Sequence, residues 1–504
     1  MTAGAATGRY VLALDEGTTS ARSIAFDRSG AIVAVAQREF PQRYPAPGDV
    51  RHDPEAIWEA QLATAREVIA AVGGAGEVAA IGVTNQRETA IVWERAGGRP
   101  VADAIVWQSR VTAPFCEALR ATGHEPAVRA KTGLPLDAYF TGPKIRQVLL
   151  EDPSLRPRAE AGELAVGTVD SFLIWRLTGG LVHVTDISNA SRTLLLDIRR
   201  GAWDDDLLRL MEVPAPLLPE VRSSSEVYGE TEPSLFGRPI PIAGAAGDQQ
   251  AATFGQACFE PGDAKVTLGT GAFLLANTGS EPAQSEHGLL ATIGWQLGPD
   301  RPITYAIEGS VFVTGAAVQW LRDGLGLIAD SSEVETLASS VDDSGGVVFV
   351  PAFVGLGAPY WDPDARGTIS GLTRGSGGAQ LARATLDAIA FQVRDIVEAM
   401  DGDLGSPLTV VRVDGGGAGD LVCQLIADQV DRPVERPVVR ETTAFGVAAL
   451  AGLAVGFWKD PGEIAAIRSI ERRFLPAGDP GKRDAGYRAW RRAVERSRGW
   501  ADPG

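Results

Sequence analysis

The stretch RYVLALDEGTTSARSIAFDRSGAIVAVAQ, residues 9–37, decides the fold at the start of the chain. It contains three short runs of β-forming residues joined by glycine-containing turns, which predicts an antiparallel meander of three strands. Asp15 ends the first run, and Gly17 allows the chain to turn tightly after it. The stretch therefore predicts a strand, a turn wide enough for a phosphate group and a second strand.

Helices and strands alternate further along the chain. Asp53 and Pro54 suit the N-cap and first position of a helix that runs to residue 72, and residues 79–86 return as a buried strand. Residues 264–279 again have the pattern of strand, Gly-Thr-Gly turn and strand, before a long amphipathic helix at 379–400 and a strand at 409–414. We therefore predict an α/β protein with two similar halves, 1–250 and 251–504.

The composition is that of a large globular protein with an acidic surface. The 504 residues, of which 45% are hydrophobic, suffice for more than one core. The net charge of -17 repels nucleic-acid phosphates and anionic lipid headgroups. We therefore expect no nucleic-acid partner and no membrane insertion, and a buried helix in the apolar stretch 442–458.

The chain ends and the cysteines indicate a cytoplasmic protein. The first ten residues, MTAGAATGRY, lack a basic region and a continuous apolar run, so no signal peptide is expected, and the last four, ADPG, are expected to form a free end. The three cysteines are widely spaced, which indicates neither a disulfide framework nor a thiolate metal site. A reducing cytoplasm fits this pattern.

Three turns rich in glycine and hydroxyl groups are candidates for phosphate binding. They are DEGTTSAR at 15–22, LGTGAF at 268–273 and VDGGGAGD at 413–420, and the last precedes a helix whose N-terminus could face a nucleotide. Each alone can be a plain connection between strands, but three in this order favour a nucleotide site. The sequence contains no GxxxxGK[ST] or GxGxxG run, and its four histidines form no ligand-like pair.

Long motifs over nearly the whole chain resemble the FGGY carbohydrate kinases. They include YVLALDEGTTSAR, GVTNQRET, AGAAGDQQAATFGQ, AIEGSVFVTGAAVQWLRD and PAFVGLGAPYWDPDARG. The resemblance implies two ribonuclease H-like domains of the actin, Hsp70 and hexokinase type, with the active site in the cleft between them. It also implies phosphoryl transfer from ATP with Mg²⁺, and within the family it points to members that convert glycerol to sn-glycerol 3-phosphate. Such proteins are commonly dimers or tetramers, so a homodimer or homotetramer is expected.

The chemistry of the residues suits such a substrate. A triol offers only hydroxyls, so its pocket needs charged acceptors, a fork of several donors and some apolar cover. Arg87 and Glu88 end a buried strand and are either an internal ion pair or part of a polar ligand site. Any single aromatic residue can instead be plain core. The resemblance assigns the substrate pocket to Arg87, Glu88, Trp107, Tyr139, Asp248, Gln249 and Phe273.

The resemblance also assigns the reacting groups. Asp248 is expected to be the general base that accepts the proton of the substrate hydroxyl, although a helix N-cap is an alternative role for it. Asp15 matches the carboxylate that handles Mg²⁺, through water. The expected nucleotide contacts are Thr18, Thr19, Ser20, Arg22, Thr270, Gly315, Gln319, Gly416 and Asp420.

Several positions depart from the family pattern. Asp420 stands where an Asn usually contacts adenine, and a carboxylate only accepts hydrogen bonds whereas an amide also donates. We therefore expect ATP affinity to be weakened by about 1–3 kcal/mol and improved by Asp420→Asn. Gln147 replaces a Trp of the family's first signature, and Glu16 replaces the usual Gln. The Gly-rich loop that binds fructose bisphosphate in enteric relatives and the histidine modified in some Gram-positive relatives are absent, so neither regulation is expected.

Other functions remain open at this stage. The same fold serves kinases for other polyols or ketoses, and a catalytically weakened relative is a further alternative because of Asp420 and Gln147. A switch ATPase of the actin-like or chaperone class would bind ATP without phosphorylating a substrate. The expected pocket argues against this last class, because a switch ATPase has no use for a triol site.

Overall fold

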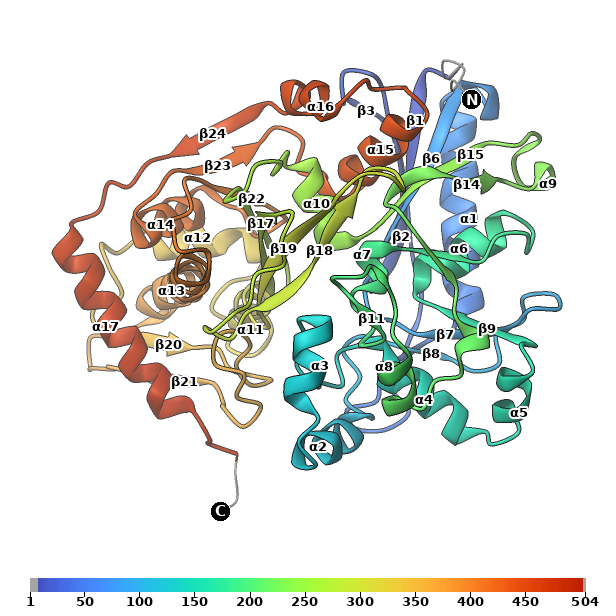
Figure 1. The fold of residues 1–504 in the computed structure, drawn as a ribbon. Helices are drawn as coiled ribbons and strands as arrows, with labels where there is room; N and C mark the ends of the chain where they lie inside the picture. Colours follow the sequence, from blue (N-terminus) through green and yellow to red (C-terminus); the bar gives the residue numbers. More distant parts are fainter. Residues whose placement is uncertain (1–7, 502–504) are drawn as a thin grey trace.

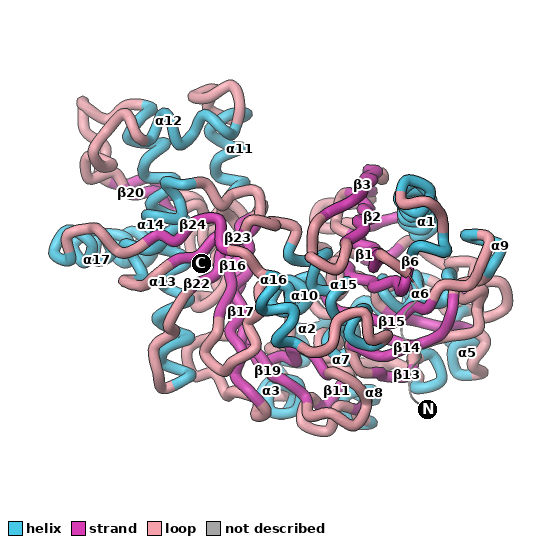
Figure 2. The backbone as a smooth tube through the Cα atoms, turned by 90° about the horizontal axis from the view of Figure 1, so that it is seen from above, coloured by secondary structure: helices cyan, strands magenta, loops and turns pink. Residues whose placement is uncertain are grey.

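The structure is a computed structural model that describes residues 8–501. It has two α/β halves, seen on the right and left of Figure 1, each built on one large mixed sheet. Seen from above, helices α10 (Asp248–Gly255) and α15 (Thr442–Ala454) lie between the two sheets (Figure 2). The expected absence of a signal peptide and the expected free C-terminal end concern mainly residues 1–7 and 502–504, which lie outside the described residues.

The first sheet has six strands. Their order is β14 (Ser225–Glu230), β15 (Pro241–Gly247), β6 (Val78–Asn85), β1 (Tyr10–Glu16), β2 (Ser20–Phe26) and β3 (Ile32–Glu39). The antiparallel pairing of β1 with β2 and of β2 with β3 confirms the predicted meander, and β1, β6 and β15 run parallel. Every residue of β6 is buried, and α1 (Pro54–Ala71) is capped by the side chain of Asp53, as predicted.

The second sheet repeats this plan with seven strands. Their order is β18 (Leu290–Gln296), β19 (Ile303–Val311), β17 (Ala272–Gly279), β16 (Ala264–Leu268), β22 (Val411–Asp414), β23 (Val434–Pro437) and β24 (Ile470–Phe474). Strands β16, β17 and β19 are antiparallel neighbours, with β18 added beyond β19, and β16, β22 and β23 run parallel. The order β19, β17, β16, β22 and β23 matches that of β3, β2, β1, β6 and β15 in the first sheet, which confirms the predicted pair of ribonuclease H-like units. The long helix α13 (Gly378–Leu404) and α14 (Asp420–Val430) pack on the second sheet.

Shorter elements complete the two halves. They are β4 (Gln42–Arg43), β5 (Arg51–His52), β7 (Ile91–Glu94), β8 (Ala104–Ile105), α2 (Ala113–Ala121), α3 (Glu125–Thr132), α4 (Thr141–Glu151), α5 (Leu155–Glu160), β9 (Leu164–Gly167), α6 (Val169–Leu177), β10 (Val184–Asp186), α7 (Ile187–Ala190), β11 (Leu196–Asp197), β12 (Ala202–Trp203), α8 (Asp205–Leu210), β13 (Glu220–Arg222), α9 (Pro233–Phe236), α11 (Gly315–Asp323), α12 (Val334–Ala338), β20 (Val348–Val350), β21 (Thr368–Ser370), α16 (Pro461–Ile467) and α17 (Pro480–Ser497).

Helix α15 joins the two halves. It comes late in the chain yet packs against the first sheet, where its alanines and Phe445 share a core with strand β1. It crosses α10 closely, since a Cβ on Gly446 would lie 1.8 Å from the carbonyl oxygen of Ala251. This confirms the buried helix predicted at 442–458, and among residues 8–501 no helix is long and apolar enough to cross a membrane. Helix α15 belongs by sequence to the predicted second half but packs on the first sheet. The division of the chain at residue 250 therefore stays a prediction.

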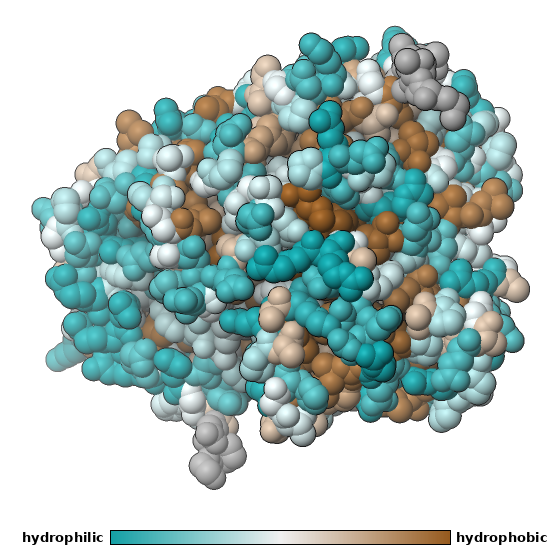
Figure 3. Space-filling view, in the orientation of Figure 1, coloured by the Kyte–Doolittle hydropathy of each residue, from teal (hydrophilic) through white to brown (hydrophobic). Residues whose placement is uncertain are grey.

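The surface is largely hydrophilic on the face shown in Figure 3. Apolar residues occur there in separate groups. The apolar side chains are concentrated in cores on both faces of the sheets. The two sheets thus form rigid supports whose strand ends can hold a site between them.

Candidate active site

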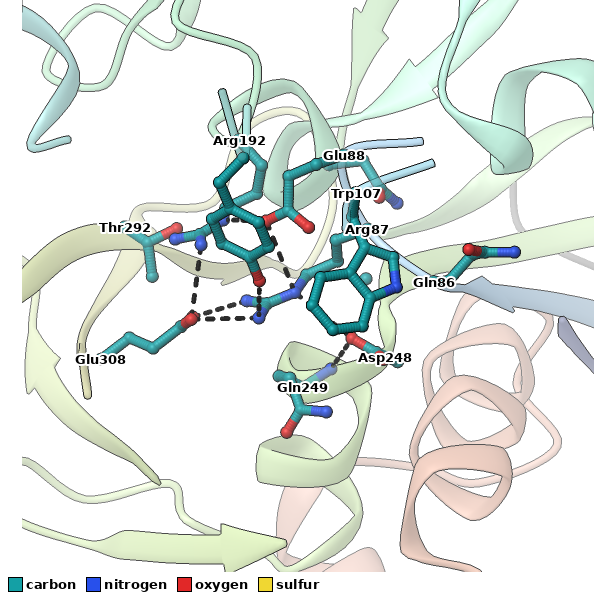
Figure 4. A network of polar contacts seen from close by, with 12 residues as sticks. Gln86, Arg87, Glu88, Trp107, Arg192, Asp248, Gln249, Thr292 and Glu308 are labelled. Atoms are coloured by element: carbon teal, nitrogen blue, oxygen red, sulfur yellow. Dashed lines mark hydrogen bonds and ion pairs between the residues drawn. The ribbon is translucent and has the colours of Figure 1, made fainter. Parts of the chain in front are cut away.

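Two neighbouring parallel strands of the first sheet end at the same place. Asn85 is the last residue of β6 and pairs with Gly247, the last residue of β15. The residues that follow, Arg87 and Asp248, therefore emerge side by side at the carboxyl edge of the sheet, where ligands bind in open α/β sheets (Figure 4). The Arg87 Nε lies 3.3 Å from Asp248 Oδ1.

Arg87 is buried and is held by a carboxylate from the second sheet. Its Nη1 donates to Glu308 Oε2 at 2.5 Å and its Nη2 donates to Glu308 Oε1 at 3.0 Å. Nη2 also donates to the Tyr139 hydroxyl at 3.4 Å. This two-pronged pair fixes the plane of the guanidinium group and leaves only Nε on the side of Asp248.

A second buried arginine completes a cluster of charges. Arg192 donates from Nε to Glu88 Oε1 at 2.7 Å and from Nη2 to Glu308 Oε1 at 3.3 Å. Burial alone would raise the pKa of Glu308, but Arg192 and Arg87 lower it to about 2. Two cations thus face Glu88 and Glu308, which neutralises the cluster inside the protein.

Sequence reasoning did not single out Arg192 and Glu308. Glu308 lies in the apolar strand β19, in AIEGSV, and Arg192 lies in the loop after α7. A single charged residue inside an apolar strand indicates a buried partner, and that signal was available for Glu308. The sequence does not identify that partner, because Arg87 and Arg192 are more than a hundred residues from Glu308 in the chain.

Glu88 has an unusual backbone held by a buried lysine. Its φ is +61°, a left-handed conformation that is uncommon for a residue with a side chain. The Glu88 carbonyl oxygen accepts hydrogen bonds from Lys144 Nζ at 3.1 Å and from Thr141 Oγ1 at 3.2 Å. Lys144 also donates to the Tyr139 carbonyl, and burial lowers the pKa of Lys144 to about 7. Lys144, a residue that the sequence analysis missed, thus fixes the main chain at two predicted pocket residues.

Three aromatic side chains form a wall beside Arg87. The ring centroid of Trp107 lies 5.8 Å from that of Tyr139 and 6.4 Å from that of Phe273, both edge to face. The guanidinium carbon of Arg87 lies 5.9 Å from the Phe273 ring. The structure therefore brings six of the seven predicted substrate residues into one cluster. Gln249 directly follows Asp248, and its side chain contacts Lys265.

Asp248 is the accessible acid of this cluster. About a third of its side chain is exposed (33%), whereas the side chain of Glu308 is fully buried. It is the first residue of α10, and its Oδ1 accepts a hydrogen bond from the Gln249 N–H at 2.7 Å; the N-cap position itself belongs to Gly247. Burial raises the pKa of Asp248, and Arg87 and Lys265 oppose this rise. An accessible carboxylate beside a cation is suited to accept a proton from a bound ligand.

The first predicted phosphate turn lies next to the aromatic wall. The Gly17 N–H donates to the Ser20 carbonyl at 3.0 Å, which closes the turn, and Trp107 Nε1 donates to Thr18 Oγ1 at 3.0 Å. Thr19 is exposed in this turn. The turn and the aromatic wall are therefore parts of one site.

Asp15 and Arg22 lie at the base of this turn. Arg22 donates to Asp15 Oδ2 at 2.6 Å and to Glu441 Oε2 at 2.8 Å. Burial raises the pKa of Asp15, while Arg22 opposes the rise. Asp15 Oδ1 has no hydrogen-bond donor among residues 8–501, so one oxygen is free for a ligand.

The second and third turns lie side by side in the second sheet. Strand β16 runs parallel to β22, and the Gly417 N–H donates to the Leu268 carbonyl at 2.9 Å. A Cβ on Gly415 would lie 2.4 Å from that same carbonyl, so only glycine fits there. Gly315 begins α11 against the second turn, and its N–H donates to the Gly269 carbonyl at 3.1 Å. Thr270 and Gly416 are exposed at the tips of the two turns.

One N–H of the helix after the third turn is bound by a carboxylate of the protein, and the nucleotide expected at this helix end stays a prediction. The N–H of Val422, in the first turn of α14, donates to Glu335 Oε1 at 3.1 Å. A Cβ on Gly419 would collide with the same carboxylate. A side chain of α12 therefore caps this helix end, where the sequence suggested that a nucleotide could lie.

Two predicted nucleotide residues lie apart from the substrate cluster. Asp420 pairs with Arg436 at 2.7 Å and with Arg472 at 2.5 Å, and these arginines lower the pKa of Asp420. Gln319 lies exposed on α11. Neither contacts the substrate cluster within the described part of the chain.

Comparisons with known proteins agree over nearly the whole chain. Residues 10–255 match the N-terminal domain of the FGGY family of carbohydrate kinases, and residues 264–455 match its C-terminal domain. A glycerol kinase of Carboxydothermus hydrogenoformans is 56% identical over 497 residues, covering 98% of this chain and 99% of that protein. A crystal structure of Plasmodium falciparum glycerol kinase with ADP is 34% identical, with a TM-score of 0.90, and covers 97% of this chain and 98% of its own.

The same fold also occurs with other substrates. A gluconate kinase from Lactobacillus acidophilus superposes with a TM-score of 0.85 at 21% identity, covering 96% of this chain and 97% of its own, which shows a shared fold alone. Family membership follows from the matches to both family domains and from the identity to glycerol kinases. The chain belongs to the FGGY family of carbohydrate kinases.

Proposed function

We propose that this protein is a glycerol kinase, which transfers the γ-phosphoryl group of ATP to glycerol and forms sn-glycerol 3-phosphate. The observation that carries the proposal is the accessible carboxylate of Asp248, 3.3 Å from the buried Arg87 and beside an aromatic wall. The high identity to glycerol kinases over the full length supports the choice of substrate. The protein would act in the cytoplasm as a homodimer or homotetramer.

The substrate pocket suits a small triol. Arg87 and Glu88 offer a donor and acceptors to hydroxyl groups, as do Tyr139 and Gln249. Trp107 and Phe273 would cover the C–H edges of the substrate and exclude water. This combination gives a switch ATPase no advantage, because such a protein binds no polyol acceptor beside ATP.

Asp248 would act as the general base. Its carboxylate would accept the proton of the attacking hydroxyl while the oxygen bonds to the γ-phosphorus and the bond from that phosphorus to the β,γ-bridging oxygen breaks, which releases ADP. Arg87, at 3.3 Å, supports the ionised form of the carboxylate before reaction. The Gln249 N–H, at 2.7 Å from Oδ1, keeps the carboxylate oriented.

The nucleotide would lie across the three turns. Thr18, Thr19, Ser20 and Arg22 would contact phosphate oxygens from the first sheet, and Thr270, Gly315 and Gly416 from the second. Gln319 and Asp420 would lie further along the nucleotide. Closing the cleft between the two sheets would then exclude water and favour transfer over hydrolysis.

Asp15 suits a role with Mg²⁺. Its free oxygen is a hard ligand, and within residues 8–501 no group of three or more His, Cys, Asp or Glu side chains could hold a metal ion. This fits Mg²⁺, which proteins often hold through one or two carboxylates, water and substrate phosphates. When bound, the ion would neutralise negative charge on the phosphates of ATP.

The test is ADP production by the purified protein with Mg-ATP, alone and with glycerol, erythritol, xylulose, gluconate or dihydroxyacetone. We expect a signal that depends on glycerol, with little background. Asp248→Asn should lower kcat by about 10²-fold or more and leave the thermal midpoint unchanged. ADP release without any substrate would favour a switch ATPase, and a stronger signal with another polyol or ketose would reassign the substrate.

A further inference from the structure

Lys265 is a fully buried cation beside the proposed base. It lies on β16, and its Nζ donates to Gln249 Oε1 and to Thr267 Oγ1, the latter at 2.9 Å. Among residues 8–501 no carboxylate lies within ion-pair distance of this ammonium group. Burial lowers the pKa of Lys265 to about 8, and Asp414 and Asp248 oppose that fall. A buried charge with neutral partners is costly and calls for a functional reason.

The contact fixes which way the Gln249 amide points. An ammonium group only donates, so the Gln249 atom that faces it must be the acceptor Oε1. The Nε2 group of Gln249 is therefore turned away from Lys265, and it donates to no residue within 8–501. Gln249 thus has two N–H donors left for a ligand, next to Asp248 (Figure 4).

Lys265 also lies near the Asp248 carboxylate, because it contacts the side chain of Gln249, whose N–H donates to Asp248 Oδ1 at 2.7 Å. Four charged groups influence this carboxylate: the cations Arg87, after β6, and Lys265, on β16, and the carboxylates Asp15 and Glu16, both on β1. The two carboxylates disfavour ionisation of Asp248 and the two cations favour it. Removing Lys265 would leave one cation against two anions.

We propose that Lys265 is a positioning residue for phosphoryl transfer, which orients the Gln249 amide toward the substrate hydroxyls and supports the ionised form of Asp248. The proposal rests on the proposed function, since it concerns the same pocket. It separates two effects that can be measured independently. Orientation of Gln249 governs the KM for the polyol, and the charge governs the pH at which Asp248 becomes active.

The experiment compares Lys265→Met with Gln249→Ala and with the double variant. Losing one well-oriented hydrogen bond corresponds to about 1.4 kcal/mol, so we expect the glycerol KM to rise about tenfold in Lys265→Met, with the ATP KM unchanged. If Lys265 acts on KM through Gln249, the double variant should have the same glycerol KM as Gln249→Ala alone. If the rise in glycerol KM of the double variant equals the rises of the two single variants multiplied together, Lys265 does not act on KM through Gln249.

The pH profile tests the charge. Without the cation the pKa of Asp248 rises, so the acid limb of kcat/KM should move to higher pH in Lys265→Met and stay in place in Gln249→Ala. Lys265→Gln keeps an N–H donor but no charge, so its acid limb should move while its KM rises less. An acid limb that stays in place in both Lys265 variants would overturn the role assigned to the charge.

Controls separate this proposal from folding and from the proposed function. Lys459→Met removes an exposed lysine and should match the wild type. Circular dichroism establishes which variants fold, and if Lys265→Met does not, Lys265→Gln decides by the same two measurements. Loss of ATP binding together with glycerol binding would mean a general structural role and overturn the proposal. A wild-type protein that fails to phosphorylate glycerol would refute the proposed function instead.

Discussion

Glu308→Gln tests whether the buried charge cluster holds the two halves together. The carboxylate accepts hydrogen bonds from Arg87 Nη1 at 2.5 Å, Arg87 Nη2 at 3.0 Å and Arg192 Nη2 at 3.3 Å. A glutamine keeps the volume but replaces one oxygen by an NH₂ group, which faces guanidinium donors. Within residues 8–501, Glu88 would then be the only carboxylate that contacts both buried arginines.

The magnitude follows from the pKa of Glu308. A fall from 4.5 to about 2 corresponds to about 3 kcal/mol of stability at neutral pH. Breaking a buried ion pair by removing one partner costs about 3–5 kcal/mol, which agrees. With about 2.1 cal/mol/K of unfolding entropy per residue, the thermal midpoint should fall by about 3 °C if all 504 residues unfold together. It should fall by about twice that if the second half unfolds separately.

The pH dependence has a defined sign. Because folding lowers the pKa of Glu308, its contribution is complete above pH 4.5 and is lost as the pH falls toward 2. The gap in thermal midpoint between wild type and variant should therefore be constant near neutrality and shrink in acid. Differential scanning calorimetry from pH 7 to pH 3 measures it, with the exposed Glu286→Gln as matched control. A loss at pH 7 no larger than that of the control would refute the reasoning.

Three further predictions concern single residues. Glu16 is buried with the Gln86 amide as its partner, and burial raises the pKa of Glu16. The ionised Glu16 therefore destabilises the folded protein above that pKa and has no such effect in acid. Glu16→Gln should stabilise the protein by about 1–3 kcal/mol at pH 8 and not at pH 4, measured by denaturant titration. Asp420→Asn should lower the nucleotide KM by up to about tenfold and change stability by less than about 1 kcal/mol, because its ion pairs are half exposed; an unchanged KM in a steady-state assay would contradict this. Lys144→Met should raise the glycerol KM and leave the ATP KM unchanged, because it removes the hydrogen bond from Lys144 to the carbonyl oxygen of Glu88, whose backbone is left-handed. Equal rises in both constants would argue for general unfolding instead.

Much of the architecture was predictable because it depends on local pattern. The meander at 9–37, the capped helix after Asp53 and the buried helix near 442 follow from alternation, turn residues and capping, which act over a few residues. The long motifs identified the pocket residues. The pairing of β6 with β15 explains why Arg87 lies beside Asp248. Parallel strands that end together place such residues together.

Tertiary structure alone decided which distant charges meet. Nothing in the local pattern pairs Glu308 with Arg87 and Arg192, or sets Lys265 against Gln249, because these contacts depend on how the two sheets face each other. The capping of α14 by Glu335 depends on how α12 packs beside α14 within the second half. The packing of α15 on the first sheet depends on the docking of the two halves. A sequence pattern determines which side chains a strand buries, whereas the partner of a buried charge is determined by the element that packs against that strand.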